Sequence, residues 1–434
     1  MTIVIARYAL LVVGCMTALF AQSDPLQDLN KKVNESTDGV LSFTLEERTR
    51  WEEKFGVNFG KAVNQQDMLS RVRIGAQFTP FSWLKISAMG QDSRAPFFGV
   101  AAPTSMRDSI DLQESYVQIL GRTKTGFGMN VGRQMLDYGE GRVIGTPQWS
   151  NTSRTYDEAR VYYGWRKAKF EALMVSPVKI LADAYNRPEL GERIWGTYDT
   201  FGDVWKKASL DVYILRHSQN KIGGWSGAGT LGTNSFGGRF FGPLQRGFAY
   251  SFEVVGQAGH SGLLQQRAFA AFGGVTKKTT VAGKPFVLSA EYKVASGTKA
   301  GSKNSGTYDQ LAPANHDKFG HLDLFGWRNL KTFKSLETLS VTKSLAVNLM
   351  YTNHWLYSAT DSLFNGQGAV LATSKTGVAG THVGQELDAF ATYKRGVHTF
   401  GAGFGHLFKG EFIDIATSRI NPRYFYFFQQ YTIK

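Results

Sequence analysis

The alternation of short and long connections constrains the possible fold of this chain more than any other feature. About eighteen segments of roughly ten residues alternate apolar and polar side chains between residues 41 and 433. The connections between these segments alternate in length: some are short, as at 80–82 and 342–344, and the others are long, as at 93–109 and 297–328. Short turns at one rim and long loops at the other are typical of a membrane-spanning barrel, whereas compact soluble domains seldom tolerate loops of this length. We therefore predict an all-β fold, an antiparallel up-and-down transmembrane β-barrel of about 18 strands.

The alternation within single segments supports this prediction. In segment 68–78, Val72 and Ile74 share one parity, while Arg71 and Arg73 share the other. Successive side chains of a strand point to opposite faces, so one face suits lipid and the other suits a polar lumen. The last segment is strongly aromatic, and its expected lipid-facing residues are Phe425, Phe427, Tyr431 and Ile433.

The N-terminus predicts export. Arg7 precedes an apolar run at 8–20, and Ala21 provides a plausible cleavage position, as in a secretory signal peptide. No other run is long and apolar enough for a membrane helix, which excludes a helical membrane protein. The single cysteine, Cys15, lies inside the signal, so the mature chain has no disulfide or cysteine metal site. The expected divisions are a signal peptide at 1–21, a periplasmic lead-in at 22–40 and a barrel at 41–434.

The charge of the chain points to anionic permeants. Lysine and arginine number 49 against 35 acidic residues, a net charge of +14. A barrel of about 18 strands encloses water, and rings of Arg and Lys in a pore favour anions, with guanidinium groups especially suited to carboxylates. Porin lumens are polar in any case, and basic residues at the outer rim could instead bind lipopolysaccharide. The inward parity holds Arg48, Arg50, Arg71, Arg73, Lys85 and Arg160, and the acids that could pair with them are Glu46, Glu114, Glu158, Glu386 and Asp388.

Other chemistries find little support. The glycine runs at 223–229 and 401–405 do not precede helices, so they are not phosphate loops. His217 and Ser218 are adjacent, so on a strand they point to opposite faces and cannot act as a catalytic pair. The cations are dispersed rather than clustered with aromatic residues, which argues against nucleic-acid binding. We expect no enzyme activity, no cofactor, no metal and no nucleic acid.

The stretch 128–165 carries a family resemblance. Two alternating segments flank a polar, glycine-rich loop, and the stretch resembles the signature of the alginate export family. The matching positions are Gly132-Arg133-Gln134, Tyr138-Gly139, Arg142, Gly145, Trp149, Asn151, Arg154, Asp157 and Arg160.

The resemblance implies an eighteen-stranded barrel with an electropositive constriction that passes a polyuronate outward. Carried over by residue, it implies pore positions for Arg133, Arg142, Arg154 and Arg160. Loop 138–156 could fold inward and bring two of these arginines to the pore. Asp157 and Glu158 would then buttress the constriction.

Three functions remain open at this point. The first is passive export of an anionic polysaccharide such as alginate through the outer membrane of a Gram-negative bacterium. The second is an uptake porin for small anions or oligouronates, and the third is an outer-membrane enzyme. Expected partners are the anionic polysaccharide or another anionic solute, outer-membrane lipid and lipopolysaccharide, and periplasmic export proteins. Whether loop 297–328 plugs the lumen is also open.

Overall fold

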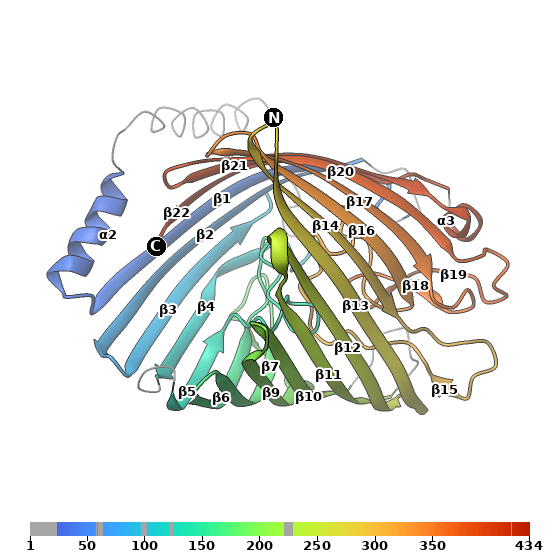
Figure 1. Ribbon diagram of the computed structural model, residues 1–434, viewed down its shortest axis with the longest axis horizontal. Coiled ribbons are helices and arrows are strands. Elements are labelled where there is room, and N and C mark those ends of the chain that lie inside the picture. The colour runs from blue at the N-terminus through green and yellow to red at the C-terminus, as the bar shows by residue number, and fades with distance from the viewer. Residues whose placement is uncertain are drawn as a thin grey trace.

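Eighteen antiparallel strands close into one barrel (Figure 1). The computed structural model describes residues 24–57, 59, 64–96, 102–120, 125–220, 229–417 and 419–434, so the predicted signal peptide lies outside the described residues. The first strand pairs with the second on one side and with the last on the other, which closes the ring. The barrel strands are β1 (Leu41–Phe55), β2 (Asn64–Phe81), β3 (Leu84–Arg94), β4 (Asp108–Ile119), β5 (Gly126–Gln134), β6 (Tyr156–Trp165), β7 (Ala168–Lys179), β9 (Glu192–Trp205), β10 (Ala208–Gln219), β11 (Leu231–Pro243), β12 (Phe248–Ser261), β13 (Leu264–Val281), β14 (Lys284–Ala295), β16 (Leu330–Ser340), β17 (Leu345–Leu356), β20 (His382–Arg395), β21 (His398–Lys409) and β22 (Arg423–Ile433).

Smaller elements gather at the two ends of the barrel. Helix α2 lies beside the C-terminus at one end, and α3 lies with the short strands β15, β18 and β19 at the other (Figure 1). None of the helices among the described residues is long and apolar enough to cross a membrane. The bounds of these elements are α2 (Pro25–Ser36), β8 (Arg187–Pro188), η3 (Gln245–Gly247), β15 (Asn304–Ser305), β18 (Ser362–Phe364), β19 (Val370–Thr373) and α3 (Glu411–Ala416).

The predicted fold is confirmed, and each predicted segment overlaps one barrel strand. The differences lie at the edges. Strand β2 continues to Phe81, so the turn predicted at 80–82 is shorter than expected. Residues of the predicted lead-in form helix α2, because Pro25 suits its first turn and the Asp24 carboxylate accepts hydrogen bonds from two backbone N–H groups there.

The two faces of the wall differ as the alternation predicts. On β2, Ile74 is 62% exposed and Val72 is 37% exposed, whereas Arg71 and Arg73 are buried. On β22, Phe425 and Phe427 are exposed and Tyr426 between them is buried, but Ile433, which was also expected to face lipid, is only 4% exposed. The outward side chains can contact lipid, and the inward ones are covered by loops that enter the barrel.

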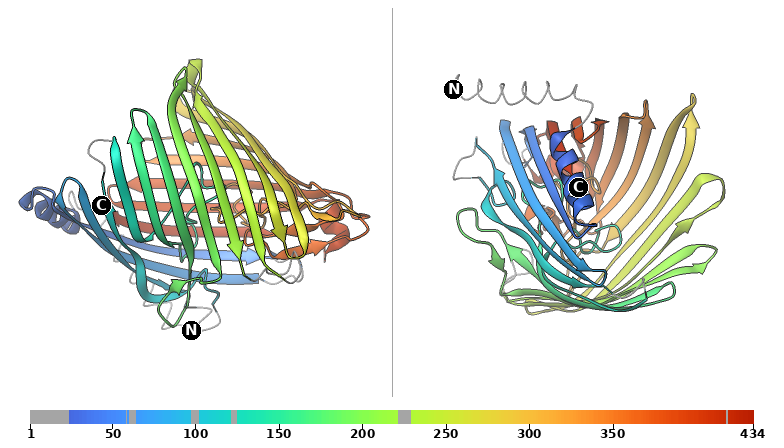
Figure 2. Two further views of the ribbon diagram at one scale, coloured as in Figure 1. Left: turned by 90° about the horizontal axis from the view of Figure 1, so that it is seen from below. Right: turned by 90° about the vertical axis from the view of Figure 1, so that its left-hand side faces the viewer.

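Two loops fill much of the interior. We call residues 135–155 the first inner loop and residues 296–329 the second inner loop. They meet at a parallel bridge between Ile144 and Ala312, where the Ala312 N–H donates to the Val143 carbonyl over 3.0 Å. Ile144 is fully buried in a core that the loops share with the inner face of the wall. The strand wall surrounds this interior in the end-on view (Figure 2, right), so the inner loops determine what space is left for a permeant.

Candidate permeation site

Four arginines on the first two strands form the basic feature of the lumen. Arg48, Arg50, Arg71 and Arg73, here called the arginine cluster, are each at most 4% exposed. The register places Arg48 directly opposite Arg71 and Glu46 directly opposite Arg73. Glu46 forms ion pairs with Arg71, at 2.6 Å, and with Arg73, at 3.8 Å. Directly opposed like charges are unfavourable in a sheet, so the Arg48–Arg71 pair needs further acceptors.

The first inner loop supplies those acceptors as backbone carbonyls. Arg48 donates to the carbonyls of Gln148, Trp149 and Ser150 over 2.9–3.1 Å. Arg71 donates to the carbonyls of Gln148 and Ser150 over 3.1 and 2.9 Å. The carbonyl dipoles offset the positive charge without neutralising it. The arginine cluster therefore holds the first inner loop against the wall and remains a source of positive potential.

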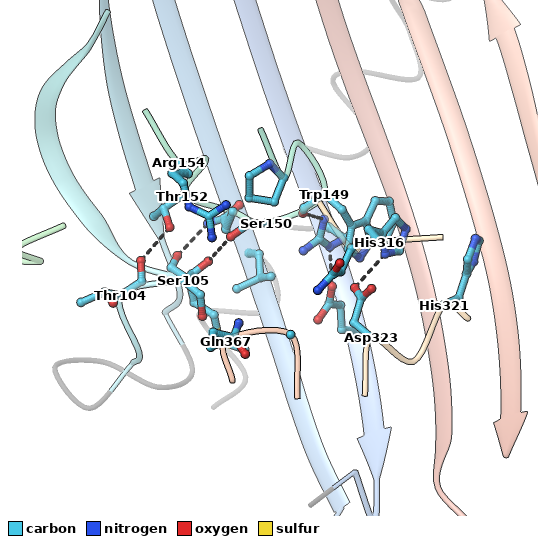
Figure 3. Close-up of a pocket in the computed structure, with 18 of the residues that line it drawn as sticks. Thr104, Ser105, Trp149, Ser150, Thr152, Arg154, His316, His321, Asp323 and Gln367 are labelled. Atoms are coloured by element: carbon cyan, nitrogen blue, oxygen red, sulfur yellow. Dashed lines mark hydrogen bonds and ion pairs between the residues drawn. The ribbon is translucent and has the colours of Figure 1, made fainter. Parts of the chain in front are cut away.

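A column of rings extends from the cluster to Phe390 of β20, which lies three strands along the wall from β1. The Arg50 guanidinium lies 4.1 Å from the centre of the Trp149 ring, and His316 stacks on Trp149 at 4.5 Å and 5°. His321 follows at 4.9 Å from His316, and Phe390 of β20 follows at 4.2 Å from His321. This stacked column passes through both inner loops, and Figure 3 shows Trp149 beside His316 and His321 further along. It joins β1 to β20 past the two intervening strands, β22 and β21.

The two histidines of the column have different electrostatic surroundings. His316 contacts Asp323 through Nδ1 at 2.7 Å. Burial, with a smaller contribution from the neighbouring His316, lowers the pKa of His321 to about 3. The neutral His321 ring lies with Nδ1 3.3 Å from the Tyr426 hydroxyl. The column therefore depends on an uncharged His321.

Glu386 and Asp388 hold the second inner loop rather than an arginine. Both are fully buried on β20. Glu386 accepts from the Leu322 N–H at 2.9 Å, and Asp388 lies 3.4 Å from the His321 N–H. Within the described part of the chain neither forms an ion pair, so the predicted pairing with arginines is not observed for them. The physical reason is position, because β20 contributes to the far end of the stacked column.

Arg142 reaches across the lumen from the first inner loop, as the resemblance implied. It forms ion pairs with Glu140, at 2.6 Å, and with Glu291 of β14, at 3.6 Å, and it lies 3.4 Å from the centre of the Phe272 ring. Arg239 of β11 pairs with the same Glu140 at 3.0 Å. Burial alone would raise the pKa of Glu140, but the two arginines lower it below its usual value. Glu140, Arg239 and Glu291 line a cavity of about 250 Å³.

Arg154 lies at the junction of two cavities. The first, the Trp149 cavity, measures about 410 Å³ and is drawn in Figure 3. The second, the His217 cavity, measures about 450 Å³, and Arg154 and Pro313 line both. Arg154 donates to the Pro313 carbonyl at 2.9 Å. It forms no ion pair with any described residue, so it presents an uncompensated charge at this junction.

A network around Asp309 anchors the second inner loop. Asp309 is 1% exposed, and its carboxylate contacts His217 Nδ1 at 2.7 Å. It also accepts from the Thr233 hydroxyl at 2.9 Å and from Arg328 at 3.1 Å. His217 contacts Glu192 through its other nitrogen at 3.1 Å. Burial alone would raise the pKa of Asp309, but His217 and Arg328 hold it well below its usual value, so the carboxylate stays charged.

Sequence reasoning missed this network. Asp309 lies in a loop without periodicity, and the eight histidines showed no common motif. The parity of β10 could have placed His217 inside the barrel, because it shares the inward parity of Leu215 and Tyr213. No parity argument could have brought Asp309 to it.

The Asp309→Ala variant should lose several degrees of thermal stability. Removing one partner of a buried charge network costs about 3–5 kcal/mol, because the remaining charges are left uncompensated. The measurement is thermal unfolding of the purified barrel in detergent. Asp183→Ala, which removes an exposed carboxylate from the Arg107–Asp183 pair, is the matched control and should change little. Equal unfolding temperatures for Asp309→Ala and the native protein would contradict the anchoring role.

The remaining predicted residues divide between the two faces. Arg160 faces inward on β6 and pairs with Glu158 at 2.7 Å. Glu114 faces inward on β4 and accepts from the Met135 N–H at 3.0 Å, at the start of the first inner loop. Lys85 shares the inward parity of β3 near its short-turn end. None of these four side chains contacts Arg154 in the described part of the structure.

Arg133 and Asp157 face outward, which corrects the pore position that the resemblance implied for Arg133. Arg133 shares the parity of Val131, which is 41% exposed, and Asp157 is its direct partner on β6. Arg133 donates to the Asp157 carboxylate at 2.7 Å and to the Asn186 carbonyl at 3.2 Å. The pair fastens the loop between β7 and β9 to the outer wall. Asp157 therefore does not buttress a constriction.

The side chains that commonly bind metals do not gather in one place in the part of the chain that the structure describes. Across residues 24–434, apart from the undescribed gaps, no group of three or more His, Cys, Asp or Glu side chains could hold a metal ion. The site consists of arginines, backbone carbonyls and stacked rings. Guanidinium groups are suited to hydrogen bonds with carboxylates.

Comparison of the fold with solved structures finds outer-membrane porins of Pseudomonas aeruginosa. OccK8 (OprE) matches with a TM-score of 0.62 at 10% identity, covering 91% of this chain and 98% of that one. OccD3 (OpdP) matches with a TM-score of 0.61 at 12% identity, covering 91% of both chains. OpdK, solved with vanillate, matches with a TM-score of 0.59 at 7% identity, covering 91% of this chain and 98% of that one. At these identities the likeness shows the fold alone.

Comparison of the sequence with protein families is more specific. No curated protein matches the chain. The family model for alginate export matches residues 40–427, which is nearly the whole barrel. The chain is a porin-like outer-membrane β-barrel that belongs to the alginate export family.

Proposed function

We propose that this barrel is a passive channel for an anionic polysaccharide, alginate or a related polyuronate, which moves through the lumen past the arginine cluster and Arg154. One observation carries the proposal: the basic groups here exceed their acidic partners. Among the described residues, the four arginines of the cluster form ion pairs with two carboxylates, Glu46 and Glu52. Arg48 and Arg154 have no carboxylate partner among the described residues. A surplus of guanidinium groups in a narrow aqueous space favours carboxylate-bearing solutes.

The space left by the inner loops suits a single extended chain. The Trp149 and His217 cavities measure about 410 and 450 Å³. Sites for small ligands are typically about 300–1,000 Å³, so each cavity accommodates a short stretch of a sugar chain. A folded or branched polymer would need the inner loops to move aside. The proposal is therefore passage of an unbranched chain, one short stretch at a time.

A second candidate is uptake of small anions or oligouronates. The inner loops restrict the lumen, and this restriction favours the second candidate, because small solutes can pass without a rearrangement of the loops. A channel without an energy source passes its solute down the gradient, so both candidates use the same residues. The family and the solved structures of similar fold are channel proteins, and no enzyme activity is proposed.

The Arg154→Ala variant tests the proposal. In a planar bilayer with a KCl gradient, the native channel should give a reversal potential that indicates anion preference. The variant should lower the anion-to-cation permeability ratio by roughly two- to fivefold, because an uncompensated charge in a narrow site acts at low effective dielectric. Arg187→Ala removes an equal charge from the short strand β8, where Arg187 is exposed, and should leave the ratio unchanged. Cation preference in the native channel would contradict the proposal.

A further inference from the structure

Helix α2 is fixed to the seam where β1 and β22 close the barrel. The pairing of these strands ends at Leu45 and Ile433, so the first residues of β1 have no β22 partner. Asn30 of the helix fills the gap: its side-chain amide donates to the Phe43 carbonyl, and its oxygen accepts from the Phe43 N–H, both at 2.9 Å. The Tyr431 hydroxyl donates to Asp24 at 2.7 Å. The helix thus continues the wall where β22 ends.

The attachment places the helix at the outer surface of the barrel. Tyr431 shares the outward parity of β22 with the exposed Phe427. Phe43 likewise points outward from β1 and is 40% exposed. Both residues that hold the helix therefore belong to the face that contacts lipid. In Figure 1 the helix lies at the end of β1 beside the C-terminus.

The helix exposes two leucines toward the surroundings. Leu26 is 49% exposed and Leu29 is 56% exposed, and their spacing of three residues puts them side by side on one face. Asn30, which binds the seam, is only 9% exposed. Lys31 and Lys32 follow and are exposed. Exposed leucines next to exposed lysines are typical of a helix that lies along a membrane surface.

The neighbouring wall has an exposed aromatic collar at the same level. The start of β1 pairs with the end of β2, with Leu41 opposite Phe78. Phe78, Phe81 and Trp83 are 45–56% exposed at this rim. Aromatic girdles mark the membrane–water interface of outer-membrane barrels. Leu26 and Leu29 are continuous with this lipid-facing surface, which identifies lipid as the occupant of their face.

We propose that α2 is a membrane-interface helix of the periplasmic leaflet. Leu26 and Leu29 contact the acyl chains at their boundary with the headgroups, and Lys31 and Lys32 face phosphate groups. This contact holds Asn30 and Asp24 in place and so seals the seam. The inference depends on the barrel and not on the proposed permeant.

Site-specific fluorescence in lipid vesicles tests this proposal. The full chain, carrying Cys15→Ser, receives either Leu29→Cys or Gln27→Cys, and each cysteine is labelled with an environment-sensitive dye. Gln27 lies on the opposite side of the helix and is exposed, so it is the matched control. Resistance of the barrel to unfolding in detergent confirms that both variants are folded. The vesicles contain phosphatidylcholine brominated on its acyl chains.

The expected result is at least threefold stronger bromolipid quenching at position 29 than at position 27, with the reverse order for aqueous iodide. Equal quenching by iodide at both positions would overturn the proposal, because the leucine face would then lie in water. A label at position 29 that neither reagent quenches would also overturn it, because a protein surface would then cover that face.

Discussion

A channel that carries Arg48→Ala together with Arg71→Ala should conduct roughly two- to fivefold more current than the native channel. These arginines donate five hydrogen bonds to the carbonyls of Gln148, Trp149 and Ser150. Hydrogen bonds from charged groups each contribute about 1.5–3 kcal/mol, so their loss loosens the first inner loop, which Arg50 and Asn151 still hold to the wall. Single-channel recording measures the effect as larger and noisier open-state current. Anion preference should fall as well, because two positive charges are lost.

The matched control removes two arginines from the short turns at the rim. Arg166→Ala with Arg246→Ala changes the net charge equally and touches neither inner loop. This control should keep the native conductance. If the Arg48 and Arg71 variant also kept it, the first inner loop would not restrict the lumen and the account of the arginine cluster would fail.

Acidification from pH 7 to pH 4.5 should also raise the conductance. Burial lowers the pKa of His321 to about 3, below the value near 6.5 of an exposed histidine. Between about pH 3 and pH 6.5, a His321 ring displaced into water binds a proton, whereas the stacked ring does not. The stacked column is therefore fully stable above about pH 6.5 and loses stability as the pH decreases. At pH 4.5 the loss is about 3 kcal/mol, which is enough to displace His321 from His316 and Phe390.

The His321→Phe variant separates this effect from other titrations. A phenyl ring keeps the stacking against His316 and Phe390 but cannot bind a proton. Its conductance should therefore vary little between pH 7 and pH 4.5, while the native channel responds. Rim carboxylates and the Asp323 partner of His316 remain in both proteins. An equal response in the variant would assign the pH dependence to those groups and remove His321 from the account.

The barrel could be predicted from the sequence because its determinants are local. Each strand shows its two faces within ten residues, and the lengths of the connections reveal the two rims. The same parity placed Arg71, Arg73 and Arg160 inside, where the structure has them. Parity also contradicts a pore role for Arg133, because Arg133 lies two residues after the outward Val131 and therefore faces the same side. For this residue, parity predicted the position correctly and the family resemblance did not.

The interior of the lumen could not be predicted, because its contacts join distant segments without a repeat. Ile144 and Ala312 are 168 residues apart in the sequence and pair in the structure, and no sequence pattern around either residue indicates this contact. Asp309 likewise gains its role only from the wall that surrounds it. Helix α2 was missed for a related reason: its polar composition resembles a solvated lead-in, and only the unpaired backbone of Phe43 gives Asn30 its function.

The block of single-channel current by an acidic sugar chain tests whether the lumen selects carboxylate-bearing chains. Oligouronates of defined length are added to one side of a bilayer that contains one channel, and neutral oligosaccharides of equal length serve as the comparison. We expect the oligouronate to block the current transiently. The duration of each block should increase with the length of the sugar chain and decrease in the Arg154→Ala variant, and the neutral chain should cause few blocks. Equal blocking by both sugars, or none by either, would contradict a passage that selects carboxylate-bearing chains through the arginine cluster and Arg154.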